Sequence, residues 1–114
     1  MTTTFVDPFG ITAEVIASVT VSSKTGIVPL TATGSMPYVE IPHDCGWMVA
    51  AVSGTGHVSL PPGSAVGDIV EIHALGGTVT AHGQSGESVV SSGEVQSGAG
   101  SFFRKITSTS WVHT

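Results

Sequence analysis

Short runs rich in Val, Thr and Ile, separated by clusters of Gly and Pro, make up most of the sequence. Val, Thr and Ile favour strands because their side chains pack well on a pleated surface. Gly and Pro interrupt regular structure, so each cluster marks a boundary between elements. We therefore predict strands at residues 13–23, 27–33, 37–41, 46–53, 56–60, 68–75, 77–82, 87–92, 94–97, 101–107 and 110–113.

Helix signals are nearly absent from the chain. The one candidate, Ile11 to Val19, runs directly into the strand-like alternation of Ser18 to Ser22. Many short strands at close spacing are typical of sandwiches and barrels. The fold class predicted is all-β: an antiparallel β-sandwich or a jelly-roll-like barrel with an extended N-terminal arm.

The 114 residues are enough for one domain. Residues 1–12 lack a stable repeat and contain Asp7-Pro8, which favours an extended or turn conformation. We predict an extended arm over 1–12 and a single β domain over 13–114. Phe5, Val6 and Phe9 of the arm are candidate partner-binding residues.

Alternation assigns faces to the strands around Gly76-Gly77. Val70, Ile72 and Ala74 are expected to face a core, with Glu71 and His73 on the opposite face.

Beyond Gly76-Gly77, Val79 and Ala81 are expected to face inward, with Thr80 and His82 outward. The pattern predicts a hairpin with a two-residue turn. Phe102, Ile106 and Trp111 are candidates for closing the core or for a trimer interface.

Charged residues make up only 10% of the chain, against about 25% in a typical soluble domain. Either Ser, Thr and Gly cover the surface, or much of it is buried against other copies or partners, and we favour the second explanation. The net charge is −5 with three basic residues, which argues against nucleic-acid binding and attraction to anionic membranes. No apolar run approaches the roughly 20 residues of a membrane span.

Cys45 is the only cysteine, so no disulfide is expected within the chain. A single cysteine is consistent with synthesis in a reducing cytoplasm. The N-terminus lacks the charged start and apolar stretch of a secretion signal.

The triplet His43-Asp44-Cys45 contains the residue types of a nucleophilic site. Because the three are neighbours beside a proline, a turn with an incidental cysteine is the favoured interpretation. His73, His82 and Glu71 could bind zinc or nickel, but solvated or interfacial histidines are more common. We therefore predict no metal and no cofactor.

The acidic residues, among them Asp68, do not resemble the paired carboxylates of a glycosidase in a chain this short. Asp68 is expected to fix its own turn by a side-chain hydrogen bond. Trp47 and Trp111 could stack on a sugar, although core packing is the more common role of a strand tryptophan. The prediction is that the chain is not an enzyme.

Residues 57–114 carry a layout of turns and strands that resembles small β modules of bacteriophage virion proteins. In this sequence it comprises His57 to Gly63, Val66 to Ile72, Val79 to Ala81 with Gly86 to Val89, Gly100 to Ile106 and Trp111-Val112. Such modules occur in tail fibres, head fibres and capsid decoration proteins, and they often form homotrimers. The pattern consists of turns and alternation, so it transfers no catalytic residues.

The resemblance implies a structural role in a virion, and the capsid surface is the favoured location. The leading interpretation is a decoration (cement) protein that binds the major capsid protein, or another virion protein, as a homotrimer and stabilises the lattice. The alternative is a tail-fibre, spike or collar component whose loops at 83–86 and 96–100 bind a host-surface glycan.

Overall fold

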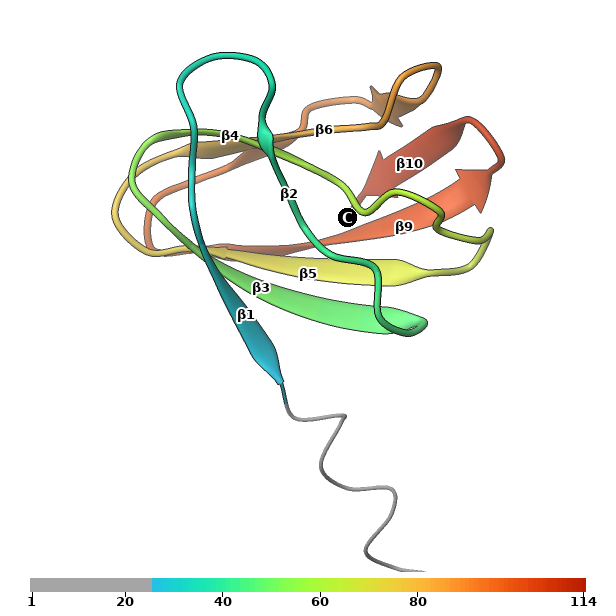
Figure 1. Cartoon of the computed structure of the whole chain (residues 1–114), viewed down its shortest axis with the longest axis horizontal. Coiled ribbons are helices and arrows are strands. Elements are labelled where there is room, and N and C mark those ends of the chain that lie inside the picture. The colour runs from blue at the N-terminus through green and yellow to red at the C-terminus, as the bar shows by residue number, and fades with distance from the viewer. Residues whose placement is uncertain (1–25) are drawn as a thin grey trace, which may run out of the picture.

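A computed structural model describes residues 26–114, which contain strands and no helix. The predicted arm with Phe5, Val6 and Phe9, and the predicted strand at 13–23, lie outside these residues. No helix that could cross a membrane occurs in the described part of the chain. The strands in Figure 1 are β1 (Ile27–Thr31), β2 (Val39–Glu40), β3 (Trp47–Ser53), β4 (Gly56–Ser59), β5 (Ile69–Ala74), β6 (Val79–His82), β7 (Ser88–Val90), β8 (Glu94–Val95), β9 (Gly100–Thr107) and β10 (Ser110–His113).

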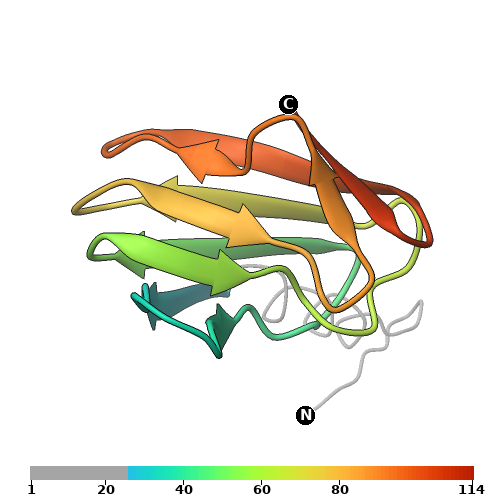
Figure 2. The same ribbon diagram turned by 90° about the horizontal axis from the view of Figure 1, so that it is seen from above.

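The strands form two facing sheets. A six-stranded sheet has the order β1-β3-β5-β9-β10-β7, and a four-stranded sheet has the order β2-β4-β6-β8. Figure 2 shows the strands of both layers side by side, with the connections at the two ends. Apolar side chains from both layers fill the space between them.

From β1 to β6 the chain crosses from one sheet to the other after every strand. As a result, β1, β3 and β5 are mutually parallel, and so are β2, β4 and β6. This arrangement is a β-solenoid of three stacked two-strand coils. The predicted antiparallel sandwich or jelly-roll-like barrel is therefore wrong, because from β1 to β6 consecutive strands lie in different sheets instead of pairing with each other.

The stacking has a regular register in the six-stranded sheet. Val28 pairs with Ala50 and Ala50 with Ile72, a step of 22 residues each time. The next inward column, Leu30, Val52 and Ala74, has the same step. Equivalent residues of successive coils thus stack in columns along the core.

The last strands reverse direction and make both sheets mixed. β8 pairs antiparallel with β6, and β9 pairs antiparallel with β5. β10 then pairs antiparallel with β9 and parallel with β7. Phe103 of β9 lies opposite Val70, so it continues an inward column across the reversal.

The predicted hairpin at Gly76-Gly77 is wrong, because β5 and β6 lie in different sheets. The predicted faces are nevertheless confirmed: Val70, Ile72 and Ala74 are buried, as are Val79 and Ala81. Alternation is a property of each strand alone, so it holds whatever the strand pairs with.

Three residues were candidates for closing the core. Trp111 is fully buried, as that role requires. Phe102 and Ile106 do not close the core, because their exposed fractions are 40% and 46%. In β9 the inward positions are Phe103 and Lys105, so Phe102 and Ile106 face the opposite way. Their candidate role at a trimer interface stays a prediction.

Candidate functional site

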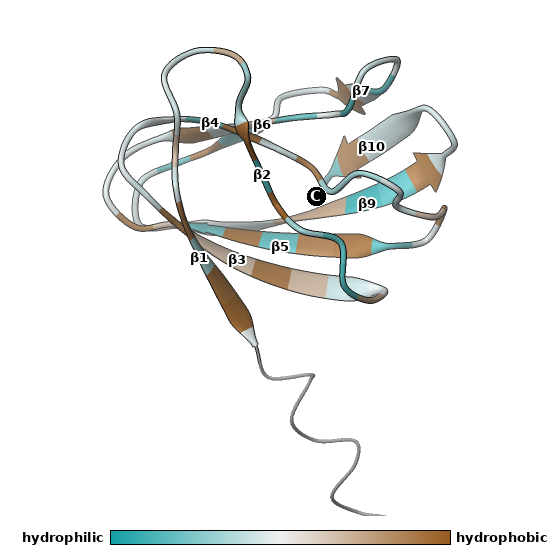
Figure 3. Ribbon diagram, in the orientation of Figure 1, coloured by the Kyte–Doolittle hydropathy of each residue, from teal (hydrophilic) through white to brown (hydrophobic). Residues whose placement is uncertain are grey.

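The outer face of the six-stranded sheet carries apolar side chains from neighbouring strands. Register aligns Trp47 with Ile69, and Ile27 with Val49. Phe102 lies opposite Glu71 on the next strand. We call the set Ile27, Trp47, Val49, Ile69 and Phe102 the outer apolar face. Figure 3 shows the hydrophobic colouring of β1 and β3.

Large side chains of this face are unusually exposed. Ile27 is 61% exposed and Trp47 is 56% exposed. The rings of Trp47 and Phe102 lie 6.2 Å apart between centroids, so they form one patch. A hollow of about 640 Å³ beside them is lined by Cys45, Gly46, Trp47, Val49 and Glu71. Contiguous exposed apolar surface of this kind marks interaction sites in soluble proteins.

Cys45 lines this hollow, but the segment His43-Asp44-Cys45 is not arranged for catalysis. The Cys45 thiol donates a hydrogen bond to the Trp47 carbonyl oxygen at 3.0 Å. Nε2 of His43 instead contacts the Asp68 carboxylate at 3.1 Å. Among the described residues, no hydrogen bond links the thiol to a histidine.

The same Asp68 carboxylate accepts a hydrogen bond from the Ala65 N–H at 2.9 Å. The predicted side-chain bond that fixes this turn is thus present. Its partner precedes Asp68 in the chain, and it ties Asp68 to the turn that leads into β5.

The predicted group His73, His82 and Glu71 is not assembled. His73 and Glu71 lie together on the six-stranded sheet, with Nε2 and Oε2 2.6 Å apart. His82 belongs to β6 of the other sheet. Within residues 26–114, no three His, Cys, Asp or Glu side chains converge as ligands for one ion.

His82 has a different partner, which the sequence analysis did not find. Nε2 of His82 lies 2.8 Å from Nδ1 of His57 on the neighbouring strand β4. The Tyr38 ring stacks on both imidazoles, at 4.7 Å from His57 and 4.6 Å from His82. Burial, and secondarily the proximity of His57, lower the pKa of His82. We call these three residues the histidine cluster.

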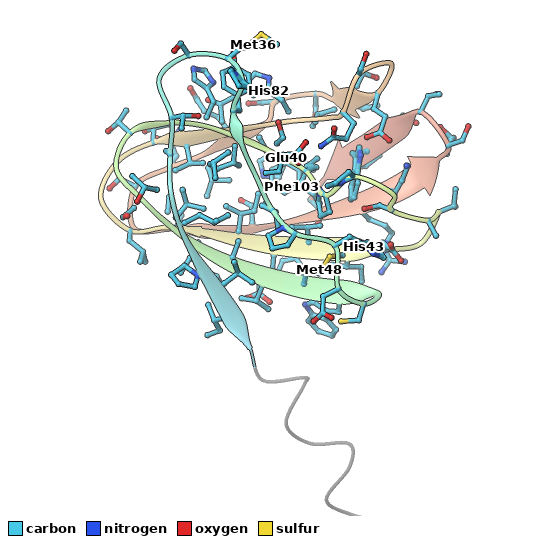
Figure 4. The ribbon with its side chains drawn as sticks, viewed as in Figure 1. Met36, Glu40, His43, Met48, His82 and Phe103 are labelled. Carbon is cyan, nitrogen blue, oxygen red and sulfur yellow. The ribbon has the colours of Figure 1, made fainter. Side chains whose placement is uncertain are left out.

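A pocket of about 410 Å³ lies beside the histidine cluster. It is lined by Tyr38, Glu40, His82, Gln84 and Ser85, together with the loop that carries Met36. Figure 4 shows Met36 and His82 on one side of the molecule, away from His43. The pocket lies on the outer surface of the four-stranded sheet, so it faces the opposite way from the outer apolar face. The predicted glycan loop 83–86 contributes to its wall.

A buried polar cluster is centred on Lys105 of β9, beyond the last of the stacked coils. The Lys105 ammonium donates to the Glu87 carboxylate at 2.8 Å and to the Ser64 carbonyl oxygen at 2.9 Å. The indole N–H of Trp111 donates to the other Glu87 oxygen at 3.0 Å.

Burial alone would raise the pKa of Glu87. Hydrogen bonds from Lys105, Trp111 and the Gln84 N–H outweigh this effect, so the pKa lies below its ordinary value. Because Trp111 is buried, it is not available to stack on a sugar, whereas Trp47 is.

Comparisons with protein-family models, with curated proteins and with solved structures found no match for this chain.

Proposed function

We propose that the protein is a structural component of a bacteriophage virion, namely a capsid decoration protein. It binds the outer shell as a homotrimer and stabilises the lattice, without catalytic activity. The observation that carries this proposal is the outer apolar face. Trp47, Phe102 and Ile27 expose aromatic and aliphatic surface that a self-sufficient small domain would bury.

The composition favours a protein that associates with other chains over one that is a monomer. With 10% charged residues, the chain has few charges to keep an exposed sheet face soluble. A specific interface buries about 1,200–2,000 Å² in total and places aromatic side chains near its centre. Phe102 and Trp47 fit such a centre. Ile106, which is also exposed on β9, extends it.

The proposed mechanism is thermodynamic linkage. A protein that binds only the assembled shell shifts the equilibrium toward that shell by mass action. The stacked coils supply a stiff scaffold for this role, because each coil is bonded to the next through both sheets. The predicted anchors Phe5, Val6 and Phe9 would bind the major capsid protein.

The test measures particle mass by light scattering and then co-sedimentation with empty capsid shells. We expect a trimer that sediments with shells, and a monomer after the double substitution Trp47→Ser and Phe102→Ser. Leu75→Ser is the matched control, because Leu75 is 62% exposed but lies in the turn after β5.

Each result of this test bears on a different part of the proposal. A trimer unchanged by the double substitution would remove the outer apolar face as the interface. A trimer that never sediments with shells would remove the decoration role. Deleting residues 1–10 should abolish sedimentation and leave the trimer intact, which separates the anchor from the trimer interface.

The alternative is a fibre, spike or collar component that binds a host-surface glycan. It is favoured by the pocket beside Tyr38, where Glu40 and Gln84 offer polar groups next to an aromatic ring. Sugar sites combine these two features. Binding to immobilised glycans that is lost in Glu40→Gln, with trimer mass unchanged, would favour this function over decoration.

A further inference from the structure

The histidine cluster holds two imidazole nitrogens that face each other across neighbouring parallel strands. Nδ1 of His57 and Nε2 of His82 are 2.8 Å apart. His57 lies opposite Thr80 and His82 opposite Ser59, so the two histidines are diagonal neighbours on the outer surface of their sheet. The pairing of β4 with β6 therefore fixes the backbone positions of both histidines.

Tyr38 restricts the rings further. Its ring plane lies 24° from that of each imidazole, at stacking distance from both. A ring that rotated away would lose this contact, so Tyr38 holds both histidines in their present orientation. Groups held in place before binding lose less conformational entropy when a ligand arrives.

The separation of the two nitrogens suits a shared ion. Imidazole nitrogens bind tetrahedral zinc at about 2.0–2.1 Å, so two of them on one ion are about 3.3 Å apart. The two nitrogens are now 2.8 Å apart, so they must separate by about 0.5 Å to share an ion. Neutral imidazole is the form that binds metal, and nickel, copper and zinc all accept it.

We propose that His57 and His82 form a binding site for one divalent transition-metal ion of the zinc, nickel or copper class. The hydrogen between the rings moves to the outer nitrogen of its own ring, leaving both inner lone pairs free for the ion. The remaining coordination positions are open to water or to a carboxylate. Glu40 lines the same pocket as His82 and is a candidate carboxylate on this face. This inference does not depend on the proposed virion role.

The pair His73 and Glu71 provides an internal comparison. It also brings a histidine and a possible second ligand together, at 2.6 Å, but no aromatic ring is stacked on it among the described contacts. Its imidazole is 42% exposed. The short contact is a charge-assisted hydrogen bond, which an ion would have to disrupt.

The experiment titrates the full-length protein with zinc chloride and, separately, nickel sulfate. Calorimetry gives the stoichiometry, and nitrogen-detected NMR of the histidine rings identifies which imidazoles bind. We expect one ion per chain, with the resonances of His57 and His82 shifted. His82→Asn and His57→Asn should abolish binding, and His73→Asn should leave it unchanged.

A second variant keeps the proposal testable if the asparagine variants fold poorly. Tyr38→Leu retains both ligands but removes the stacking ring, and should weaken binding by about tenfold. The proposal is overturned if the unmodified protein binds no ion. It is also overturned if the His57→Asn/His82→Asn double variant binds with unchanged stoichiometry, or if His73 is the ring whose resonances shift.

Discussion

The buried contact between Lys105 and Glu87 is the residue-scale feature with the clearest energetic consequence. Lys105 is 5% exposed, and its ammonium has only the Glu87 carboxylate as a counter-charge among the described residues. The Ser64 carbonyl and the Trp111 indole satisfy further groups of the pair. A buried ion pair contributes little over apolar residues of the same shape, but losing one partner leaves an uncompensated charge.

Glu87→Ala should destabilise the protein by about 3 kcal/mol, because it leaves Lys105 buried without a counter-charge. The measurement is the free energy of unfolding from urea titration. The double substitution Glu87→Gln and Lys105→Met should cost less than Glu87→Ala, since no charge then remains. Glu94→Ala, at an exposed site, should change stability by no more than about 0.5 kcal/mol. Equal losses for Glu87→Ala and the double variant would contradict this account.

The same contacts give stability a defined pH dependence. The pKa of Glu87 is lowered in the folded protein from an ordinary value of 4.5. Its contribution is therefore fully present above about pH 4.5 and is lost as the pH falls through the lower folded value. Urea midpoints between pH 7 and pH 3 should show a fall below about pH 4.5 that is smaller in Glu87→Gln. An identical acid profile in both proteins would rule out Glu87 as the source.

At the scale of elements, the turns between sheets stack as closely as the strands do. A Cβ atom at Gly77 would lie 1.9 Å from Oγ1 and 3.0 Å from Cβ of Thr55 in the preceding coil. Only glycine fits there without moving its neighbour. The turn residues Gly54, Gly76 and Gly98 recur at the 22-residue step of the strands.

Gly77→Ala should therefore destabilise the protein by about 1–3 kcal/mol through overpacking. Gly34→Ala is the matched control, because a Cβ atom there has no neighbour within 4 Å. Adding Thr55→Ala should recover part of the loss, since it removes Oγ1 but leaves the Cβ contact. Thermal unfolding of the four proteins is the measurement. A Gly77→Ala variant as stable as Gly34→Ala would show that the turns are not tightly stacked.

Strand positions and faces could be predicted from the sequence, but strand partners could not. The predicted strand at 68–75 contains β5, and its inward residues are correct, because alternation and turn signals are local. Alternation does not specify whether Ala74 pairs with Val79 across a turn or with Val52 one coil earlier. The recurrence of Gly54, Gly76 and Gly98 was the available signal for stacked coils.

Predicting the candidate sites required the same information about which strands pair. His57 and His82 are 25 residues apart in sequence, and only the pairing of β4 with β6 brings them together. In β9, two adjacent phenylalanines left two possible frames, and Phe103, not Phe102, faces the core. The hydrophobic pattern predicts that an aromatic side chain of this strand faces the core, but it does not determine which of the two phenylalanines does so.

For the whole molecule, the open end of the stack matters as much as its faces. β1 and β2 end their respective sheets within the described residues, so each has one edge without a strand partner there. Such edges invite pairing with other chains. The Ala32 N–H donates a hydrogen bond to the Ser53 carbonyl oxygen on β3. Because backbone N–H groups point alternately to the two sides of a strand, those of Val28 and Leu30 also point toward β3, whereas position 29 points toward the open edge. Pro29 has no N–H to offer at this edge, and β2 is flanked by Pro37 and Pro42.

If prolines protect this edge, Pro29→Val should restore a donor there and make the chain aggregate faster, while the trimer set by the outer apolar face keeps its mass. The matched control is Pro62→Val, because Pro62 is also exposed but lies in the turn after β4. Light scattering over time at a fixed concentration measures aggregation, and light scattering at the start measures the trimer. If only Pro29→Val aggregates faster, the open edge and the outer apolar face act separately. Proline then suppresses pairing at the edge, whereas packing through the face is retained. Equal rates in both variants would mean that the edge of β1 is not exposed in the intact protein, and a changed initial mass would place self-association at the edge instead of the face.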